Sequence, residues 1–433
     1  MDHVPISELR GLIGEDVQFS GWVKTIRDQK KMQFLVVGDR SGIVQATNEK
    51  GDNDLSVGIS RLTENSTIRL HGKVVKNVSV AAGGIEVIIE DFEVLSISEP
   101  SLPIKEDSAL DSRMDWRYID LRNDKKRLIF EIQTCIENAM RRYWIDNSFI
   151  EIHTPKLMGA ASEGGAELFT MPYFDTEACL AQSPQFYKQM AMAAGFEKVF
   201  EIGPVFRANP SFTPRHDTEF TSVDMEVSWI DSHEDVMSVE EEWIQSVLKD
   251  LSERYGSLIE EIFGTRVVVP EIPFPRITME EAHRILNRMG YIVPRTSKDM
   301  DPEGERLICE HVREEYGHEF VFVTDYPVAV RPFYHMRYDD RQDLTKSFDL
   351  LWKGLEVTTG AQREHRHEIL LSQIDDKGIS RESLKGYTDF FRYGCPPHGG
   401  LGFGLTRMLA LLLGYKNVRE VTFLYRGPKR LSP

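Results

Sequence analysis

The sequence predicts an α+β fold, with an all-β part at the N-terminus and a larger part that mixes strands and helices. Residues 1–100 contain about five short β-type segments. From residue 125 onward, helical and β-type stretches follow one another without clean β-α-β alternation, which favours an antiparallel sheet over a doubly wound one. The length of 433 residues indicates two or three domains.

The N-terminal β-type segments alternate apolar and polar residues and are separated by turn sequences. The turn Asp39–Gly42 separates two of them, and Gly83-Gly84 separates another two, which is hairpin chemistry. Five short strands in ~100 residues fit a small barrel of the OB type, with any other five-stranded barrel or sandwich as the alternative. The predicted strands are residues 17–27, 33–37, 43–47, 68–80 and 85–95.

A change of pattern near residue 100 predicts the domain boundaries. Pro100, Pro103 and a run of mixed charge predict a hinge. We therefore expect an N-terminal domain at 1–100, a hinge at 101–124 and a second domain at 125–433.

The second domain begins with a predicted amphipathic helix. Its apolar residues recur every fourth position at Leu128, Ile132, Ile136, Met140 and Trp144. A short strand that proline stops follows at 149–155. Further β-type stretches are 198–206, 220–229, 320–324 and 347–357, and further helical ones are 232–254, 279–289, 304–315 and 405–413.

The composition narrows the class of protein. Hydrophobic residues make up 41% and charged residues 28% of the chain, as in ordinary globular proteins. No apolar run approaches the ~20 residues of a membrane span, and the start lacks a secretory pattern. The four cysteines are far apart without a Cys-x-x-Cys pair, which argues against structural zinc and for a reducing, cytoplasmic setting. A net charge of −17 argues against broad nonspecific nucleic-acid binding, DNA included.

Two motifs carry arginines in positions suited to a polyphosphate. A predicted strand ends at Arg207, and Arg215 follows in a polar loop before the next strand. Paired guanidiniums offer planar forks of donors to phosphate oxygens, although a surface hairpin with solvated arginines has the same pattern. Near the C-terminus, the glycine-rich run 400–404 precedes Arg407 at the start of an apolar helix, where glycine lets a ligand approach but also serves packing.

In their order, these segments resemble the three signature motifs of class II aminoacyl-tRNA synthetases. The resemblance is to the archaeal and eukaryotic type of aspartyl-tRNA synthetase, of subclass IIb, and covers essentially the whole chain. The matching segments are 21–23, 162–165, 181–188, 331–334, 360–363, 396–398 and 428–431.

The resemblance implies a catalytic domain built on an antiparallel sheet flanked by helices, an OB-fold anticodon-binding domain, and a homodimer through the motif around Pro155. The implied activity is ATP-dependent conversion of L-aspartate to aspartyl-adenylate and its transfer to the 3′ end of tRNA-Asp. Transfer to tRNA-Asn is left open, because Lys24 stands where specific relatives often carry tryptophan and relaxed ones histidine. An asparaginyl enzyme and an inactive tRNA-binding paralogue are the alternatives.

The resemblance also implies a site for ATP and magnesium. Arg207, Arg407 and Glu356 are the implied catalytic residues, and Mg²⁺ is expected on Glu356 and Thr359, with Asp349 nearby in sequence. The implied ATP-binding residues are Arg207, Asn209, Arg215, His216, Asp217, Phe220, Glu356, Gly404 and Arg407. All three catalytic residues are present, which disfavours the inactive paralogue.

Two cations are expected to select aspartate over asparagine. An asparagine amide would leave Lys188 and Arg363 underpaired, and an unpaired buried charge costs ~3–5 kcal/mol. This cost supports discrimination of roughly 10²-fold or more. Sister asparaginyl enzymes carry an acidic residue at the position of Lys188. The implied aspartate-binding residues are Glu163, Gln185, Lys188, Arg207, Tyr334, Thr359 and Arg363.

In the barrel, the resemblance implies that Phe34 and Gln45 stack on and read the central anticodon base. Their separation of 11 residues suits two adjacent strands joined by the turn Asp39–Gly42. Aromatic stacking with hydrogen bonds to base edges is the usual way to recognise single-stranded RNA. Lys24 and Arg27 are expected to add phosphate contacts. From pattern alone, the alternatives are a core position for Phe34 and solvated charges for the basic residues.

Besides Lys24, three short stretches of the chain depart from the family pattern. Asn209 stands where glutamate is usual after the motif arginine, Thr406 stands where wider class II has an acid, and Tyr425-Arg426-Gly427 replaces Pro-Arg-Asp.

Overall fold

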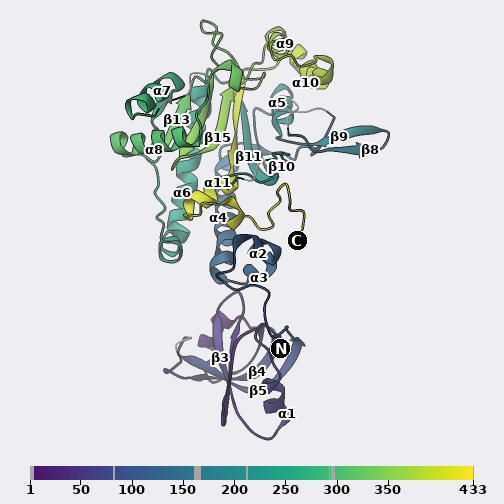
Figure 1. The fold of residues 1–433 in the computed structure, drawn as a ribbon, viewed down its shortest axis with the longest axis vertical. Helices are drawn as coiled ribbons and strands as arrows, with labels where there is room; N and C mark the ends of the chain where they lie inside the picture. The colour runs from purple at the N-terminus through teal and green to yellow at the C-terminus, as the bar shows by residue number, and fades with distance from the viewer. Residues whose placement is uncertain are drawn as a thin grey trace. The chain divides into compact units, whose positions relative to one another are not determined.

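The computed structural model describes residues 4–80, 83–159, 167–210, 213–291, 293 and 298–432. The chain forms two compact units, Met1–Ala109 and Leu110–Pro433 (Figure 1). In the part of the chain that the structure describes, no helix is long and apolar enough to cross a membrane.

The first unit is a closed five-stranded barrel, as predicted, with strand order β1-β2-β3-β5-β4. All neighbouring strands are antiparallel except β3 and β5, which pair in parallel. Its strands are β1 Asp16–Asp28, β2 Met32–Gly38, β3 Ile43–Glu49, β4 Thr67–Lys76 and β5 Ile85–Ser96, and its helical segments are η1 Ile6–Gly11 and α1 Asp54–Ser60.

The barrel closes around alternate side chains of its strands. Val17, Phe19 and Val23 of β1 belong to this core with residues of the other four strands. At Gly72 in β4 the backbones come so close that a Cβ atom would lie 2.1 Å from the carbonyl oxygen of Ile88. Glycine is therefore required where β4 and β5 change register.

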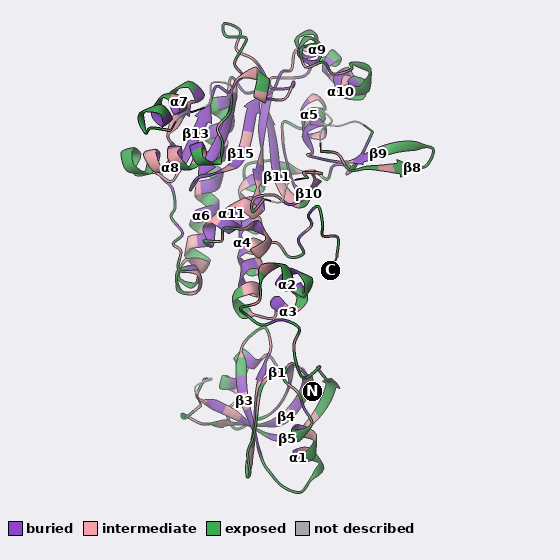
Figure 2. Ribbon diagram, in the orientation of Figure 1, coloured by how far each residue is buried: buried purple, intermediate pink, exposed green. Residues whose placement is uncertain are grey.

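The second unit is built on an eight-stranded sheet in the order β12-β13-β14-β15-β16-β11-β10-β6. The six central strands are antiparallel, as predicted, whereas the edge strands β6 and β12 pair in parallel with their neighbours. The strands are β6 Ile150–Glu151, β10 Lys198–Phe206, β11 Glu219–Ser228, β12 Arg276–Thr278, β13 Phe320–Thr324, β14 Ser347–Trp352, β15 Leu355–Gln362 and β16 His398–Gly404. Figure 2 shows that the central strands are largely buried.

Three predicted strands differ from the observed ones. The strand predicted at 68–80 ends four residues early, as β4 Thr67–Lys76. The β-type stretch at 347–357 is a hairpin of β14 and β15, because Lys353 and Gly354 take positive φ values of 50° and 85° and reverse the chain. Only Ile150–Glu151 of the strand predicted at 149–155 pairs with the sheet. A separate sheet has the order β7-β9-β8, formed by β7 Leu157–Met158, β8 Thr170–Tyr173 and β9 Thr176–Leu180.

The second unit also contains ten helices within the described residues, of which α4 and α6 are the longest. The helices are α2 Leu110–Asp115, α3 Arg117–Asp120, α4 Asp124–Asp146, α5 Gln185–Ala193, α6 His233–Phe263, α7 Met279–Arg288, α8 Pro302–Tyr316, α9 His367–Asp376, α10 Lys385–Thr388 and α11 Leu405–Leu412. A capping box between Ser232 and Asp235 begins helix α6, and Gly264, with φ 71°, caps its C-terminus. The helix is thus longer than the predicted 232–254.

The predicted periodic face of α4 is the face that packs into the core. Leu128, Ile132, Ile136 and Met140 are all buried. Trp144, on the same face, stacks on Trp243 of α6 with ring centroids 4.7 Å apart. This packing holds α4 and α6 against the eight-stranded sheet, which also carries the site.

Candidate active site

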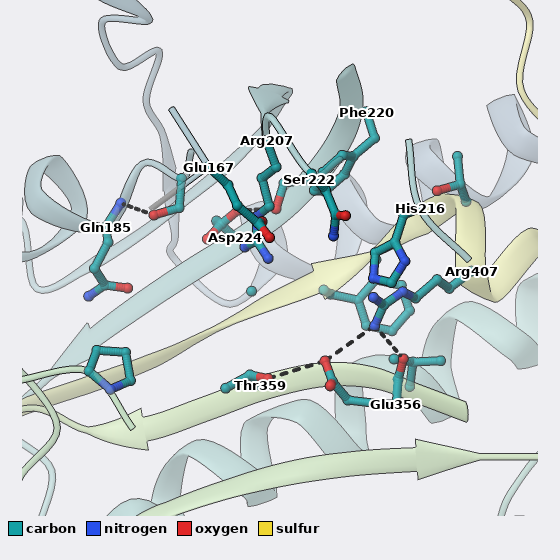
Figure 3. Close-up of a pocket in the computed structure, with 18 of the residues that line it drawn as sticks. Glu167, Gln185, Arg207, His216, Phe220, Ser222, Asp224, Glu356, Thr359 and Arg407 are labelled. Carbon is teal, nitrogen blue, oxygen red and sulfur yellow. Dashed lines mark hydrogen bonds and ion pairs between the residues drawn. The ribbon is translucent and has the colours of Figure 1, made fainter. Parts of the chain in front are cut away.

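A pocket of about 430 Å³ opens on the central strands of the eight-stranded sheet (Figure 3). Its walls come from the β10–β11 hairpin, the loop 331–335, β15, the end of β16 and the start of α11. It brings together most of the residues that the sequence predicts for ATP and aspartate. The predicted residues that line it are Gln185, Arg207, Asn209, Arg215, His216, Asp217, Phe220, Tyr334, Glu356, Thr359, Arg363, Gly404 and Arg407.

Arg207 and Phe220 face each other where the β10–β11 hairpin opens. Arg207 follows β10, and its backbone N–H donates to Thr218 O at 2.9 Å. Its guanidinium carbon lies 5.8 Å from the centre of the Phe220 ring. The predicted strand–loop–strand unit thus carries the Arg207 cation and the Phe220 ring on the same wall of the pocket.

The polar loop of this hairpin carries two groups with shifted pKa values. Burial and the nearby Arg407 and Arg207 lower the pKa of His216, so its imidazole is neutral at physiological pH. Burial raises the pKa of Asp217 to about 7, although Thr422 donates to its carboxylate at 3.3 Å. Burial is the main cause of both shifts, and perturbed groups of this kind are frequent at functional sites.

A second acid lies behind the loop. Arg215 forms an ion pair of 3.2 Å with Glu305 of α8. Burial and the neighbouring Glu356 raise the pKa of Glu305 to about 7. The hydrogen bond to Glu305 therefore fixes one end of the guanidinium at the pocket wall.

Arg407 and Glu356 form the opposite wall of the pocket (Figure 3). Arg407 Nη1 donates to the Glu356 carbonyl at 2.9 Å and to its carboxylate at 3.3 Å. Thr359 Oγ1 donates to the same carboxylate at 3.3 Å. The three predicted residues thus form one hydrogen-bonded group.

The glycine-rich run before Arg407 is explained by packing of the sheet. A Cβ atom at Gly400 would lie 2.2 Å from Met225 O on β11, and one at Gly399 would lie 2.8 Å from Ala361 O on β15. Glycine is needed for β16 to fit between these strands. The run thus fixes β16 in the sheet, and Arg407 follows in the first turn of α11. Gly402 and Gly404 also line the pocket.

The acids near Glu356 suit a divalent cation. Asp349 on β14 lies opposite Thr359 on β15. It accepts from Arg331 Nη2 at 2.6 Å, and the buried Tyr326 hydroxyl also interacts with this carboxylate. Burial raises the pKa of Asp349, and Glu356 adds to this. No cluster of three or more metal-binding side chains occurs within the described ranges, but Mg²⁺ commonly takes one or two carboxylates and completes its shell with phosphates and water.

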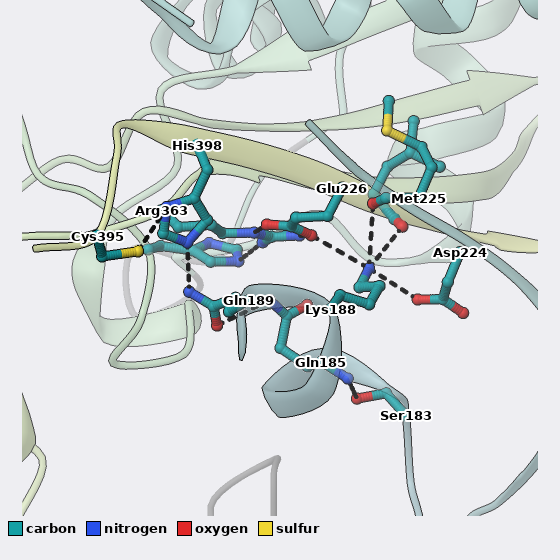
Figure 4. Close-up of polar contacts among 12 residues, drawn as sticks. Ser183, Gln185, Lys188, Gln189, Asp224, Met225, Glu226, Arg363, Cys395 and His398 are labelled. Atoms are coloured by element: carbon teal, nitrogen blue, oxygen red, sulfur yellow. Dashed lines mark hydrogen bonds and ion pairs between the residues drawn. The ribbon is translucent and has the colours of Figure 1, made fainter. Parts of the chain in front are cut away.

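Lys188 does not line the pocket, and its ammonium points toward acids of β11 (Figure 4). Its side chain, on α5, is 1% exposed. The ammonium donates to Asp224 Oδ1 at 2.9 Å and to Leu401 O at 2.9 Å, and lies 3.4 Å from Glu226 Oε2. Lys188 therefore acts on the pocket through the acids of β11.

Arg363 shares one of these acids with Lys188. Its Nε and Nη2 groups donate to the Glu226 carboxylate at 2.9 and 3.4 Å. Burial acts to raise the pKa of Glu226, but Arg363 and Lys188 outweigh it, so the pKa lies below its ordinary value. A charged glutamate thus lies between two cations, one of which lines the pocket.

Sequence reasoning missed several polar residues of the site. Ser222, Asp224 and Glu226 are on one face of β11, and the first two line the pocket. Their spacing of two residues within a predicted strand was a signal for one polar face. Glu305 carried no comparable signal, because its role depends on how α8 packs.

One predicted residue cannot be placed. Glu163, with the matching segment 162–165, lies outside the described residues.

In the first unit, Arg27 contacts two of the other predicted anticodon residues, Phe34 and Gln45. The Arg27 guanidinium lies 5.1 Å from the Phe34 ring centre, and its Nη2 donates to Gln45 Oε1 at 2.9 Å. Gln45 in turn donates to Glu86 at 3.1 Å, an acid that the sequence reasoning missed. An aromatic face and an amide thus lie together on the outside of the barrel.

Lys24 lies near the opposite end of the β1–β2 pairing. Its side chain runs along Gly38, where a Cβ atom would come within 3.0 Å of it. Arg27, by contrast, pairs with Phe34 in the ladder.

Comparison with protein-family models matches both units. Residues 109–426 match the class II tRNA synthetases (D, K and N), and residues 17–95 match the OB-fold nucleic acid binding domain.

Relatives match over nearly the full length. The aspartate–tRNA(Asp/Asn) ligase of Aeropyrum pernix is 42% identical over 99% of this chain and 98% of that protein. The aspartate–tRNA(Asp) ligase of Pyrococcus abyssi is 41% identical over 98% of this chain and 97% of that protein.

Solved structures share the fold. The asparaginyl-tRNA synthetase of Pyrococcus horikoshii in complex with asparaginyl-adenylate superposes with a TM-score of 0.92 at 31% identity, over 100% of both chains. A putative aspartyl-tRNA synthetase from Leishmania major Friedlin superposes with a TM-score of 0.85 at 30% identity, over 100% of this chain and 95% of that one.

Proposed function

This chain belongs to the class II aminoacyl-tRNA synthetases, and we propose that it is an aspartate–tRNA ligase. It activates L-aspartate with ATP to aspartyl-adenylate and transfers the aspartyl group to the 3′ end of tRNA-Asp. Full-length relatives named as aspartate–tRNA ligases support this function. The observation that carries the choice of amino acid is the pair of cations, Lys188 and Arg363, on either side of Glu226.

The activation step is in-line attack of the substrate carboxylate on the α-phosphate of ATP. This step requires no protein nucleophile, so the residues act by positioning the reactants and stabilising charge. Arg207 contacts the substrate carboxylate and the α-phosphate, and Phe220 stacks on the adenine. Arg407 covers the other face of the adenine, while Arg215 and His216 hold the outer phosphates. Their common position on the pocket walls supports these roles.

Magnesium, when bound, neutralises charge on the ATP phosphates. Glu356 would hold it with Thr359, supported by the hydrogen bond that already joins the two side chains. Asp349, opposite Thr359 in the β14–β15 pairing, has a further carboxylate in the same region.

The expectation that an asparagine amide would leave Lys188 and Arg363 underpaired is not met, because both cations are paired with acids of β11. The charges behind the pocket instead keep it from repelling a carboxylate substrate. Lys188 and Arg363 balance Asp224 and Glu226, so this buried group of four has no net charge. An acidic residue in place of Lys188 would make the group strongly negative and would repel the aspartate side chain. Asp224, which lines the pocket, can receive the substrate ammonium.

The RNA partner is proposed from the barrel. Phe34 and Gln45 are placed for stacking and edge recognition of an anticodon base, and Glu86 adds an acceptor beside Gln45. The relatives named for tRNA(Asp/Asn) and for tRNA(Asp) are about equally similar to this chain. Charging of tRNA-Asn is therefore tested together with charging of tRNA-Asp.

We also propose that the enzyme is a cytoplasmic homodimer. Ile145 at the end of α4 and Ile150 on the edge strand β6 are 58% and 48% exposed, which supports burial against a second copy. The four cysteines lie far apart in the sequence, which supports a reducing compartment.

Charging of transcripts with labelled aspartate tests the function. We expect the enzyme to aspartylate a tRNA-Asp transcript with ATP and Mg²⁺. Charging of tRNA-Asn at a comparable rate would identify a non-discriminating enzyme, and the absence of charging with either tRNA would contradict the proposal.

A further inference from the structure

A buried imidazole lies beside Arg363 in the pocket wall and takes no part in the proposed contacts with ATP or aspartate. His335 lines the pocket and is 2% exposed. Its Nε2 lies 3.0 Å from Arg363 Nη1, and the backbones of the two residues form an isolated antiparallel bridge. The imidazole and the guanidinium are therefore linked through both side chain and main chain.

The contact with Arg363 determines which ring nitrogen carries the proton. Burial and the positive charge of Arg363 lower the pKa of His335 well below its ordinary value, so the ring is neutral. A guanidinium only donates hydrogen bonds. Nε2 must therefore accept the bond, and the proton lies on Nδ1, which is buried and has no partner among the described residues.

The surroundings keep the ring of His335 in this position. Gln373 Nε2 donates to the His335 carbonyl at 3.1 Å, and Met336 N donates to Gln362 O at 3.0 Å. The Tyr334 ring packs edge-on against the imidazole with centroids 5.1 Å apart. The acceptor at Nε2 is thus held by the fold before any substrate binds.

The hydrogen bonds of Arg363 leave a defined set of donors. Glu226 takes one N–H from Nε and one from Nη2, and His335 takes one from Nη1. A guanidinium has five N–H groups. One N–H on each terminal nitrogen is therefore not used by these two partners.

We propose that His335 is a specificity-determining positioning residue, which fixes the rotation of the Arg363 guanidinium so that its two remaining N–H groups face the side chain of the substrate. The proposal rests on the proposed activation of aspartate. A carboxylate offers an oxygen to each N–H group, whereas the amide of asparagine offers one oxygen and an NH₂ group that cannot accept. A neutral acceptor orients Arg363 without adding a negative charge that would compete with the substrate.

Two substitutions separate positioning from a structural role. His335→Leu removes the acceptor but keeps an apolar side chain, and His335→Gln restores an acceptor oxygen on a flexible chain. In aspartate-dependent ATP–pyrophosphate exchange, we expect the leucine variant to raise KM for aspartate about tenfold or more. We expect its KM for ATP to stay within about twofold of wild type, and its preference for aspartate over asparagine to fall. The glutamine variant should recover most of both effects.

Several outcomes would overturn the proposal. They are a leucine variant whose KM for aspartate is within about twofold of wild type, an equal rise in KM for ATP, or a glutamine variant that is no better than leucine. Direct ATP binding verifies that each variant is folded, and His335→Phe replaces the leucine variant if that one is not. Wild-type exchange with aspartate is measured in parallel, so failure of the proposed function is distinguished from failure of this inference.

Discussion

Arg363 and Glu226 form a buried, two-point ion pair, with Arg363 Nε 2.9 Å from Glu226 Oε1 and Nη2 3.4 Å from Oε2. Glu226 is 0% exposed and also lies 3.4 Å from the ammonium of Lys188. One carboxylate thus orients both cations that the sequence predicts for aspartate. Because a buried ion pair is costly to break from one side, changes here should affect substrate choice strongly.

Replacing Lys188 by methionine should impair aspartate activation. The change removes one cation, so that Arg363 alone faces the two acids Asp224 and Glu226. Breaking a buried ion pair from one side costs ~3–5 kcal/mol of stability. We expect kcat/KM for aspartate in pyrophosphate exchange to fall by roughly 10²-fold or more. Lys249→Met, at an exposed position of α6, is the matched control and should behave as wild type. A Lys188→Met enzyme with near-normal aspartate kinetics would contradict the role of this lysine.

Replacing Phe34 by alanine should weaken recognition of the tRNA but spare the activation step. Base stacking on an aromatic ring contributes ~1–3 kcal/mol, so kcat/KM for aspartylation of tRNA-Asp should fall about 5- to 150-fold. Pyrophosphate exchange without tRNA should not change. Val78→Ala, at a barrel residue that is 81% exposed, serves as control. Equal loss in exchange and in charging would exclude a role limited to the anticodon.

Glu240 predicts how stability depends on pH. Burial raises its pKa to about 8 in the folded protein, against ~4.3 for an unfolded glutamate. Between these values the folded state binds more protons than the unfolded state, so stability falls as pH rises through this window. We expect Glu240→Gln to be more stable than wild type at pH 8.5 by at least about 1 kcal/mol, and to lose this advantage near pH 5.

Urea unfolding at the two pH values measures the effect. Glu253→Gln, at an exposed position of the same helix, is the control and should show no such trend. A pH-independent difference between Glu240→Gln and wild type would show that the carboxyl does not titrate with folding.

The proposed dimer predicts the effect of charge on the exposed edge. Aspartate at both Ile145 and Ile150 would place two charges in the apolar contact. We expect sedimentation to give about twice the 49.7 kDa of one chain for wild type and a single-chain mass for the double variant. A monomeric wild-type enzyme that charges tRNA would refute the dimer.

Much of the fold follows from local pattern. The apolar period of four at Leu128–Trp144 and the capping residues Ser232 and Asp235 determine helices that the structure contains. The turn Asp39–Gly42 likewise fixes the β2–β3 hairpin. The reversal at Lys353 and Gly354 was missed, because apolar β-type residues on both sides conceal a two-residue turn.

The site was less accessible to sequence reasoning than the fold. Arginines at the ends of a polar loop indicate a phosphate site, and Arg207 and Arg215 both line the pocket. The buried position of Lys188 could not be read from its helix, because a lysine at that spacing also suits a surface. Its pairing with Asp224 depends on how α5 packs against β11, and that packing is a property of the tertiary structure.

Amino-acid-dependent ATP–pyrophosphate exchange with aspartate and asparagine side by side tests the central claim most directly. A pocket in which Arg363 donates to the substrate carboxylate, and in which Lys188 offsets the acids of β11, predicts exchange with aspartate and at least about 10²-fold lower kcat/KM with asparagine. Exchange that prefers asparagine, or that occurs with neither amino acid, would contradict the assignment.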